Sequence, residues 1–285
     1  MKAAAFAYHR PATIDAAVGL LADLAPAGGR VLAGGQSLVP MMAFRLAQPA
    51  HLIDINHVAG LRDLEEREGN LCIGAGVRHA AFARAGVPGC LGALLGEVVK
   101  HIAHAPIRAR GTFGGSIAHA DPAAEMPGIV VTCEAKIAVV GKSGARVIEA
   151  TNFFQGPLMT ALKADEIITE IRLPAWPAKR RFGFQEFARR RGDFALAAAM
   201  LFYDEDGGKA RNAHAGAIGV ADRPLRLTAV EQVLNGNKID EAIIAKAEAA
   251  ASASVDPADD IHAGGAYRKA LIGVMVERAL KSAAA

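Results

Sequence analysis

Two short glycine segments constrain the fold of this chain more than any other feature of its sequence. Ala33 to Ser37 reads AGGQS and Thr112 to Ser116 reads TFGGS, so each places a glycine pair within two positions of a serine. Without a Cβ atom the backbone can bend tightly and can approach a neighbouring group closely. Each segment could therefore be a tight turn with a positive φ, or a loop that presents successive N–H groups and a hydroxyl to an anion.

The presence of two such segments favours an anion with two charged groups. A dinucleotide pyrophosphate fits, because its charge is spread over two adjacent phosphates that need donors from both sides. The common alternatives have the wrong spacing. The segment GAGVRH, Gly74 to His79, lacks the third glycine of the Rossmann fingerprint, and no Gly-Lys-Ser/Thr phosphate loop occurs. We therefore do not expect a standard NAD or nucleoside triphosphate site.

Composition argues against several other functions. The 285 residues are 52% hydrophobic and 21% charged, which is enough apolar material for two or three modest cores. The 32 basic and 29 acidic residues give a formal charge of +3, which is too balanced for a nucleic-acid binding surface. No apolar run has the length of a signal peptide or of a membrane span, which needs roughly 20 residues. We expect a cytoplasmic chain without a transmembrane segment.

The cysteines and histidines do not predict a metal site. Cys72, Cys90 and Cys133 are widely separated and odd in number, which is typical of reduced thiols, and they are too few for a four-cysteine iron–sulfur cluster. His101 and His104 form a His-x-x-His pair without the carboxylate of a zinc motif. We expect these histidines to be capping or loop residues.

The segment PAWPAKRR, residues 174–181, is the expected boundary between two domains, because two prolines and the lone tryptophan interrupt the periodicity. The first domain then covers 1–176, subdivided near 56, and the second covers 177–285. Basic runs at 179–181 and 189–191 could dock an acidic partner or cover a solvated strand edge.

Hydrophobic periodicity and turn residues predict a mixture of helices and strands. Helices are expected over 13–25, 89–105, 239–253 and 266–283. Strands are expected over 28–35, where the strand runs into the first glycine segment, and over 51–58, 166–174 and 182–190. Pairs of strands that reverse direction are expected over 61–77, with the reversal at 68–70, and over 194–220, with the turn at 206–208; a further hairpin is expected through 141–144.

Two stretches of the sequence resemble a known family. VLAGGQSLVPMMAFRLAQPAHLIDIN and PIRARGTFGGSIAHADPAAEMP are similar to the flavin-binding medium subunit of the molybdenum hydroxylases, which include aerobic carbon monoxide dehydrogenase, xanthine dehydrogenase and bacterial N-heterocycle hydroxylases. The resemblance continues through DEIITEIRLP and RRRGDFALAAA over nearly the whole chain. It implies an α+β fold. A two-part α/β FAD-binding domain of the PCMH or vanillyl-alcohol-oxidase type would precede a C-terminal domain of a small antiparallel sheet packed with helices.

The resemblance also implies which residues hold FAD. The pyrophosphate would lie on the two glycine segments, with Asp121 and Glu125 near sugar hydroxyls, since a carboxylate accepts from a hydroxyl and repels a phosphate. Ile102 and Ile168 would line the adenine or isoalloxazine ring, and Phe194 would lie near the flavin. The implied FAD-binding residues are Val31, Leu32, Ala33, Gly34, Gly35, Gln36, Ser37, Ile102, Thr112, Phe113, Gly114, Gly115, Ser116, Asp121, Glu125, Ile168 and Phe194. No catalytic acid, base, nucleophile or metal ligand is expected, because the flavin ring itself reacts.

The role implied by the family is a redox relay. A large subunit with a molybdenum-pterin cofactor hydroxylates the substrate, a small subunit with iron–sulfur clusters carries single electrons, and FAD on this chain passes them to an external acceptor. A dimer of such heterotrimers is implied. A self-contained flavoenzyme and a flavin-free scaffold are the alternatives.

Two departures from the family pattern affect the flavin environment. Some relatives have a lysine near Gln185 and Glu186, and some have tyrosine at the position of Phe194. The flavin potential or the acceptor is therefore expected to differ from theirs.

Overall fold

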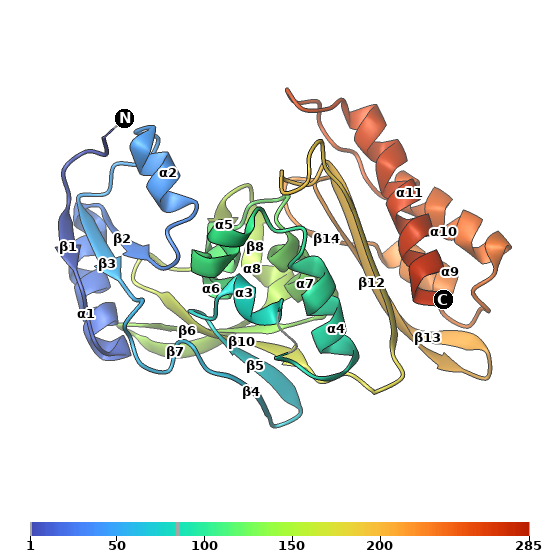
Figure 1. Ribbon diagram of the computed structural model, residues 1–285, viewed down its shortest axis with the longest axis horizontal. Coiled ribbons are helices and arrows are strands. Elements are labelled where there is room, and N and C mark those ends of the chain that lie inside the picture. Colours follow the sequence, from blue (N-terminus) through green and yellow to red (C-terminus); the bar gives the residue numbers. More distant parts are fainter. Residues whose placement is uncertain (1, 84–85, 285) are drawn as a thin grey trace.

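The computed structural model describes residues 2–83 and 86–284. Its three larger β-sheets follow one another along the long axis in Figure 1. The first sheet is parallel, with strand order β1-β3-β2, and α1 packs on it. Thr13 is the N-cap of α1, and its hydroxyl accepts a hydrogen bond from the Ala16 N–H at 3.2 Å. The elements of this part are β1 (Ala7–His9), α1 (Ile14–Leu24), the 3₁₀ turn η1 (Ala25–Ala27), β2 (Gly29–Leu32), α2 (Leu38–Ala43) and β3 (His51–Asp54).

The second sheet is antiparallel and has the order β4-β5-β10-β6-β7, so β10 joins two hairpins that lie far apart in the sequence. Short helices cover the face of this sheet that is uppermost in Figure 1. The strands are β4 (Leu64–Arg67), β5 (Asn70–Gly74), β6 (Lys136–Gly141), β7 (Gly144–Glu149) and β10 (Ile167–Pro174), with a separate pair β8 (Phe154–Gly156) and β9 (Met159–Thr160). The helices are α3 (His79–Phe82), α4 (Gly89–Val98), α5 (Ala105–Arg110), α6 (Phe113–His119), α7 (Glu125–Thr132) and α8 (Ala150–Phe153).

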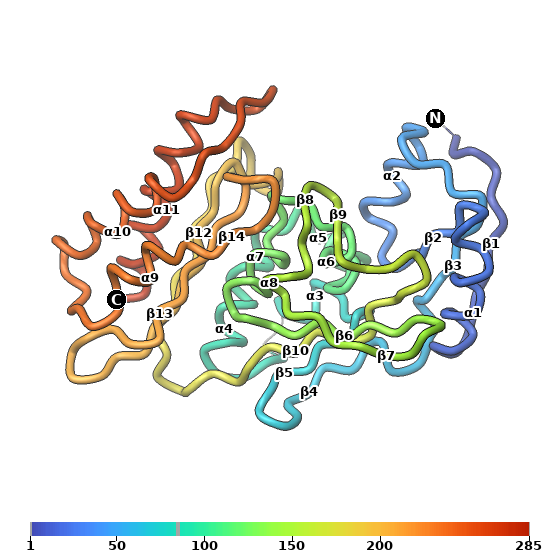
Figure 2. Tube along the Cα trace, turned by 180° about the vertical axis from the view of Figure 1, so that it is seen from behind, coloured from blue at the N-terminus to red at the C-terminus, as the bar shows by residue number. Residues whose placement is uncertain are grey.

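The third sheet is also antiparallel, in the order β11-β12-β13-β14, and it carries the C-terminal helices on one side (Figure 2). Its elements are β11 (Arg181–Phe187), β12 (Ala197–Asp206), β13 (Lys209–Ile218), β14 (Leu225–Arg226), α9 (Thr228–Leu234), α10 (Glu241–Ala253) and α11 (Gly265–Ala284). The α+β architecture expected from the sequence is confirmed.

Strand β12 is buried on both faces, which joins the third sheet firmly to the rest of the molecule. Because side chains alternate along a strand, Met200 and Phe202 point into the main core while Leu201 and Tyr203 point into a second core under the C-terminal helices. The whole of α7 is buried, and Gly128 on α7 allows it to approach Met200 closely. The third sheet is therefore covered by α7 on one face and by α9 to α11 on the other.

Two local predictions need correction. The helix expected over 89–105 ends at Val98, and a separate helix α5 begins at Ala105 after Ala103, which has a positive φ of 40°. The second glycine segment, expected as a loop, forms the start of helix α6 instead. Its N-cap Thr112 accepts a hydrogen bond from the Gly115 N–H at 3.0 Å, and this cap outweighs the low helix propensity of the two glycines.

Candidate cofactor-binding site

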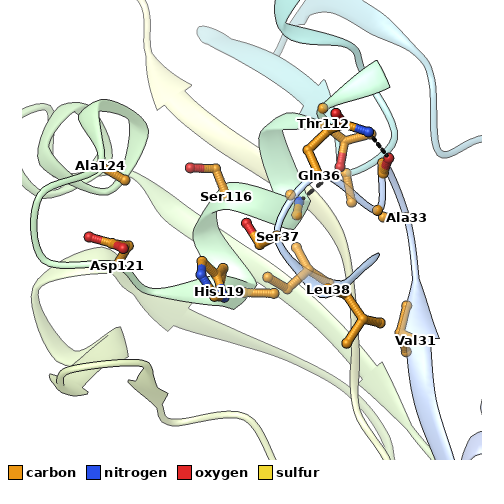
Figure 3. A pocket seen from close by; sticks show the side chains of 18 of the residues that line it. Val31, Ala33, Gln36, Ser37, Leu38, Thr112, Ser116, His119, Asp121 and Ala124 are labelled. Atoms are coloured by element: carbon orange, nitrogen blue, oxygen red, sulfur yellow. Dashed lines mark hydrogen bonds between the residues drawn. The ribbon is translucent and has the colours of Figure 1, made fainter. Parts of the chain in front are cut away.

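A cavity of about 650 Å³ lies where the first sheet, the helices of the second sheet and the loop before β12 meet. Its wall comes from β2 and the segment after it, from α6 and its flanks, and from residues 192–194. Figure 3 shows side chains of both glycine segments on this wall. A cavity of this size falls in the range that proteins use for cofactors, roughly 300–1,000 Å³.

The structure brings together nearly all of the residues that the sequence singled out. The wall includes Val31, Ala33, Gly34, Gly35, Gln36, Ser37, Ile102, Thr112, Gly114, Gly115, Ser116, Asp121, Glu125, Ile168 and Phe194. Leu32 and Phe113 do not line it. Phe113 is fully buried in the main core, with its ring centroid 5.6 Å from that of Phe82.

The first glycine segment has free backbone donors. In the described part of the chain, no hydrogen bond engages the N–H groups of residues 34–37. The Gln36 side chain donates to the Gly34 carbonyl at 3.0 Å, and Gly35 has a φ of 72° that favours glycine. This segment can therefore offer a run of N–H groups to an anion in the cavity.

The second glycine segment differs, because the N–H groups of residues 113–116 already have partners. Phe113 donates to the Val77 carbonyl at 2.9 Å, and Gly114 donates to the Ala75 carbonyl at 3.0 Å. The Gly115 N–H is engaged by the Thr112 cap, and the Ser116 N–H bonds within α6. This segment contributes the Ser116 side chain to the cavity wall.

The glycines also allow close packing between segments. A Cβ atom on Gly34 would overlap the Arg110 carbonyl oxygen and lie 2.7 Å from the Cα of Gly111. A Cβ atom on Gly114 would lie 2.5 Å from the Cβ of Ala75. Real Cβ contacts do not come this close, so Gly34 must be glycine for the first segment to approach residues 110–111, and Gly114 must be glycine for α6 to approach Ala75.

A hydrogen-bond network that sequence reasoning missed ties the first glycine segment to Arg110, two residues before the second. Asn56 donates to the Ala33 carbonyl at 2.7 Å and to Asp54 at 2.6 Å. Arg78 donates to the Asn56 side chain at 2.6 Å and to the Arg110 carbonyl. No local sequence signal marks Asn56 or Arg78, because their role depends on the packing of segments distant in the chain.

His79 is a buried wall residue that sequence reasoning also missed. Its Nδ1 has no hydrogen-bond partner in the described part of the chain. Burial, and then the positive charges of Arg108 and Arg78, lower the pKa of His79 to about 4. The imidazole is therefore neutral at physiological pH and can hydrogen-bond to a ligand.

The buried state of His79 should make the fold sensitive to acid. The unfolded chain binds a proton here below its ordinary pKa of 6.5, whereas the folded chain binds it only near 4, so stability falls as pH drops through this window. From about pH 7.5 to about pH 5, wild type should lose about 2 kcal/mol more unfolding free energy than His79→Gln. Urea unfolding of both proteins at the two pH values checks this. An equal loss in both would contradict the assignment.

Two carboxyl groups, those of Asp121 and Glu125, also belong to the cavity wall. Asp121 accepts a hydrogen bond from the Ala123 N–H at 2.9 Å and lies on the wall beside His119 (Figure 3). Glu125 is buried at the start of α7, and burial, followed by the negative charge of Glu186, raises the pKa of Glu125 to about 8. At neutral pH the Glu125 carboxyl therefore carries a proton and can both donate and accept.

Apolar residues complete the wall. Ile168 is buried, Ile102 is half-buried, and Phe194 is exposed at the rim of the cavity. The fold and the cavity together are those of a protein that binds a dinucleotide cofactor.

Family comparisons identify the cofactor. The family described as "FAD binding domain in molybdopterin dehydrogenase" matches residues 4–176, and "CO dehydrogenase flavoprotein C-terminal domain" matches residues 182–283. The chain belongs to this family of FAD-binding medium subunits of molybdenum-containing dehydrogenases, as the sequence motifs predicted.

Relatives match over the full length. The chain is 36% identical to the nicotine 6-hydroxylase medium subunit of Paenarthrobacter nicotinovorans, covering 100% of this chain and 99% of the relative. It is 36% identical to the carbon monoxide dehydrogenase medium chain of Afipia carboxidovorans, covering 98% and 97%. The solved carbon monoxide dehydrogenase from Hydrogenophaga pseudoflava superposes with a TM-score of 0.93 at 36% identity, covering 99% and 98%. Quinoline 2-oxidoreductase from Pseudomonas putida 86 gives 0.92 at 35% identity, covering 100% and 98%.

Within residues 2–83 and 86–284, no helix is long and apolar enough to cross a membrane. Over the same residues, no three His, Cys, Asp or Glu side chains come together as a metal site.

Proposed function

We propose that this chain holds FAD in the 650 Å³ cavity and passes electrons from an iron–sulfur subunit to an external acceptor, as part of a molybdenum hydroxylase of three kinds of subunit. The observation that carries the site is the first glycine segment: residues 34–37 line the cavity, and within the described chain their N–H groups have no hydrogen-bond partner. The family membership supports FAD as the occupant.

The wall residues divide into three groups by chemistry. The N–H groups of residues 34–37 would hold the pyrophosphate, with the Ser37 and Ser116 hydroxyls as further donors. Asp121 and the protonated Glu125 would bind sugar hydroxyls. Ile102, Ile168 and Phe194 would contact the rings. Bound FAD would supply the interconversion between one-electron and two-electron transfer, and the chain would orient it and exclude water.

The partner subunits follow from the relatives. The nicotine 6-hydroxylase and carbon monoxide dehydrogenase relatives are named as medium subunits or chains, which supports a small iron–sulfur subunit and a large molybdenum-pterin subunit for this chain as well. We extend the proposal to a dimer of heterotrimers in the cytoplasm, where the unpaired cysteines fit a reducing compartment. We also propose that residues 1–176 form the FAD-binding domain and residues 177–285 form the C-terminal domain. Hydroxylation of substrate would take place on the large subunit.

Purification by a tag on this chain tests the proposal. We expect the visible spectrum of a flavin and two co-purifying polypeptides, one with iron and one with molybdenum, identified by mass and metal analysis. Flavin without partners would instead indicate a self-contained flavoenzyme. Partners without flavin would indicate a scaffold, and would contradict the assignment of FAD to the cavity.

A further inference from the structure

The buried histidine on the cavity wall, His79, is not accounted for by its contacts within the described part of the chain. The residue is only 5% exposed, yet it belongs to the wall. Its Nδ1 is enclosed and has no hydrogen-bond partner there. Buried polar atoms almost always have a partner, and leaving one unpaired costs free energy. An apolar side chain would avoid this cost, so an imidazole at this position indicates a use for its other ring nitrogen, Nε2.

His79 lies beside the place where the chain approaches the first glycine segment. Its backbone N–H donates to the Gly111 carbonyl at 3.0 Å. Its ring fills the space beside Gly111, because a Cβ atom on Gly111 would lie 2.8 Å from the ring Cδ2. Gly111 in turn lies against Gly34, whose own added Cβ would come within 2.7 Å of the Gly111 Cα. The imidazole, Gly111 and Gly34 are therefore neighbours on one wall of the cavity.

The enclosure of Nδ1 decides which ring nitrogen carries the proton. A neutral imidazole has one N–H donor and one acceptor nitrogen. A proton on Nδ1 would have no acceptor, because Nδ1 is the ring nitrogen that is enclosed without a partner in the described chain. A proton on Nε2 can be hydrogen-bonded by a ligand, since Nε2 lies on the side of Gly111, at 3.4 Å from a Cβ built on that wall residue. The structure therefore assigns the N–H to Nε2.

The charges around the ring favour an anionic ligand. Arg78 and Arg108 lie close enough to His79 for their positive charges to lower its pKa, after burial, which is the largest cause. In the described part of the chain both guanidinium groups donate to uncharged oxygens, and neither donates to a carboxylate. Their charge is therefore not cancelled by an ion pair, and it would attract a negatively charged atom to this part of the wall.

We propose that the Nε2–H of His79 donates a hydrogen bond to a phosphate oxygen of the bound dinucleotide. The inference rests on the proposed function, in which the free N–H groups of residues 34–37 hold the pyrophosphate of FAD. The second glycine segment cannot add N–H groups, because those of residues 113–116 are engaged within the protein. His79 supplies a donor from beside that segment. It acts as a binding residue and takes no part in electron transfer.

Substitutions at His79 test the donor. His79→Leu removes the unpaired nitrogen and fills similar space, so urea unfolding should show stability at least equal to that of wild type at neutral pH. Its FAD affinity, measured by fluorescence titration, should be roughly 10- to 100-fold weaker, the loss expected for a hydrogen bond to a charged group. His79→Gln can place an amide N–H near the position of Nε2 and should recover part of that loss. His79→Asn, with its shorter side chain, should not.

His262→Leu is the control for the loss of a histidine. His262 is exposed in the segment between α10 and α11, so FAD affinity should stay at the wild-type value. Wild-type FAD affinity in a folded His79→Leu protein would overturn the inference. Equal losses in His79→Leu, His79→Gln and His79→Asn would also overturn it, because they would indicate packing of the ring and not donation from Nε2.

Two fragments of the cofactor separate a phosphate contact from a contact with the flavin ring. ADP has the pyrophosphate without the ring, and riboflavin has the ring without phosphate. His79→Leu should weaken the binding of ADP, measured by displacement of FAD or directly by calorimetry, and leave the binding of riboflavin unchanged. A loss for riboflavin with none for ADP would contradict the phosphate assignment.

Nitrogen NMR tests the proton position without any ligand. In the full-length chain labelled at histidine with ¹⁵N, the ring signals that disappear in His79→Gln belong to His79. At neutral pH they should show a protonated Nε2 and an unprotonated Nδ1, and ADP should shift the Nε2 proton. A proton on Nδ1 would overturn the inference.

The outcomes distinguish this inference from the proposed function. If wild type binds FAD and His79→Leu binds it equally well, FAD remains the occupant and the His79 contact is wrong. If wild type binds ADP but not FAD, the proposed function fails, and the ADP affinities of wild type and His79→Leu still decide the role of His79. If wild type binds neither, both are wrong.

Discussion

Gly34→Ala should cost the chain most of its FAD. The new Cβ would overlap the Arg110 carbonyl oxygen and lie 2.7 Å from the Cα of Gly111, and both of these are backbone atoms that cannot rotate away. Overpacking of this kind costs about 1–3 kcal/mol and moves the segments apart. Because the N–H groups of residues 34–37 would then lose their position, we expect FAD affinity to fall by roughly 100-fold, about 2.7 kcal/mol.

Gly114→Ala should act on the opposite wall in the same way, since its Cβ would lie 2.5 Å from the Cβ of Ala75. Gly19→Ala is the control, because nothing lies within 4 Å of a Cβ at that position in α1. FAD affinity is measured by fluorescence titration and folding by urea unfolding. Wild-type affinity in a folded Gly34→Ala protein would show that the close approach of the two segments does not support the cofactor site.

Arg268→Met should destabilise the C-terminal part of the molecule by at least about 2 kcal/mol, because two carbonyl oxygens lose their donor. Arg268 on α11 is buried, and its guanidinium donates to the carbonyls of Leu196 at 2.8 Å and Gly219 at 2.7 Å and to Asp260 at 2.7 Å. Methionine fills similar space but leaves those carbonyl oxygens without donors. Leu196 lies two residues beyond Phe194, so the rim of the cavity should loosen as well.

Lys281→Met on the same helix is the control for Arg268→Met. Lys281 pairs with Glu241 and Glu277 on the surface, and such exposed pairs are worth about 0–1 kcal/mol. Urea unfolding of the two variants beside wild type gives the comparison. A loss in Arg268→Met no larger than that in Lys281→Met would mean that the buried guanidinium does not hold α11 on the third sheet.

Local signals in the sequence were sufficient for most of the fold. Thr13 predicted the start of α1, the reversal at residues 68–70 predicted the hairpin of β4 and β5, and the turn at 206–208 predicted the hairpin of β12 and β13. These features depend on neighbours within a few residues. The family motifs then pointed to wall residues of the cavity, because the glycine segments are contiguous in the sequence.

The roles of individual atoms depended on contacts between distant segments and were not predictable in this way. The two glycine segments look alike in sequence, yet residues 34–37 keep free N–H groups, whereas the carbonyls of Ala75 and Val77, just after β5, accept from Gly114 and Phe113 of the second segment. The placement of Arg78 and His79 beside the cavity depends on the approach of residues 110–112. The burial of the Glu186 side chain on β11 likewise depends on residues distant in the sequence, among them His101.

The double burial of β12 has a practical consequence for anyone who wishes to dissect this protein. A fragment that ends near residue 176 would leave the apolar residues of α7 facing water, and a fragment that begins there would expose Met200 and Phe202. Such uncovered apolar surfaces promote aggregation. The smallest unit suited to recombinant expression is therefore the entire chain, and point substitutions are better tools than truncations for separating its activities.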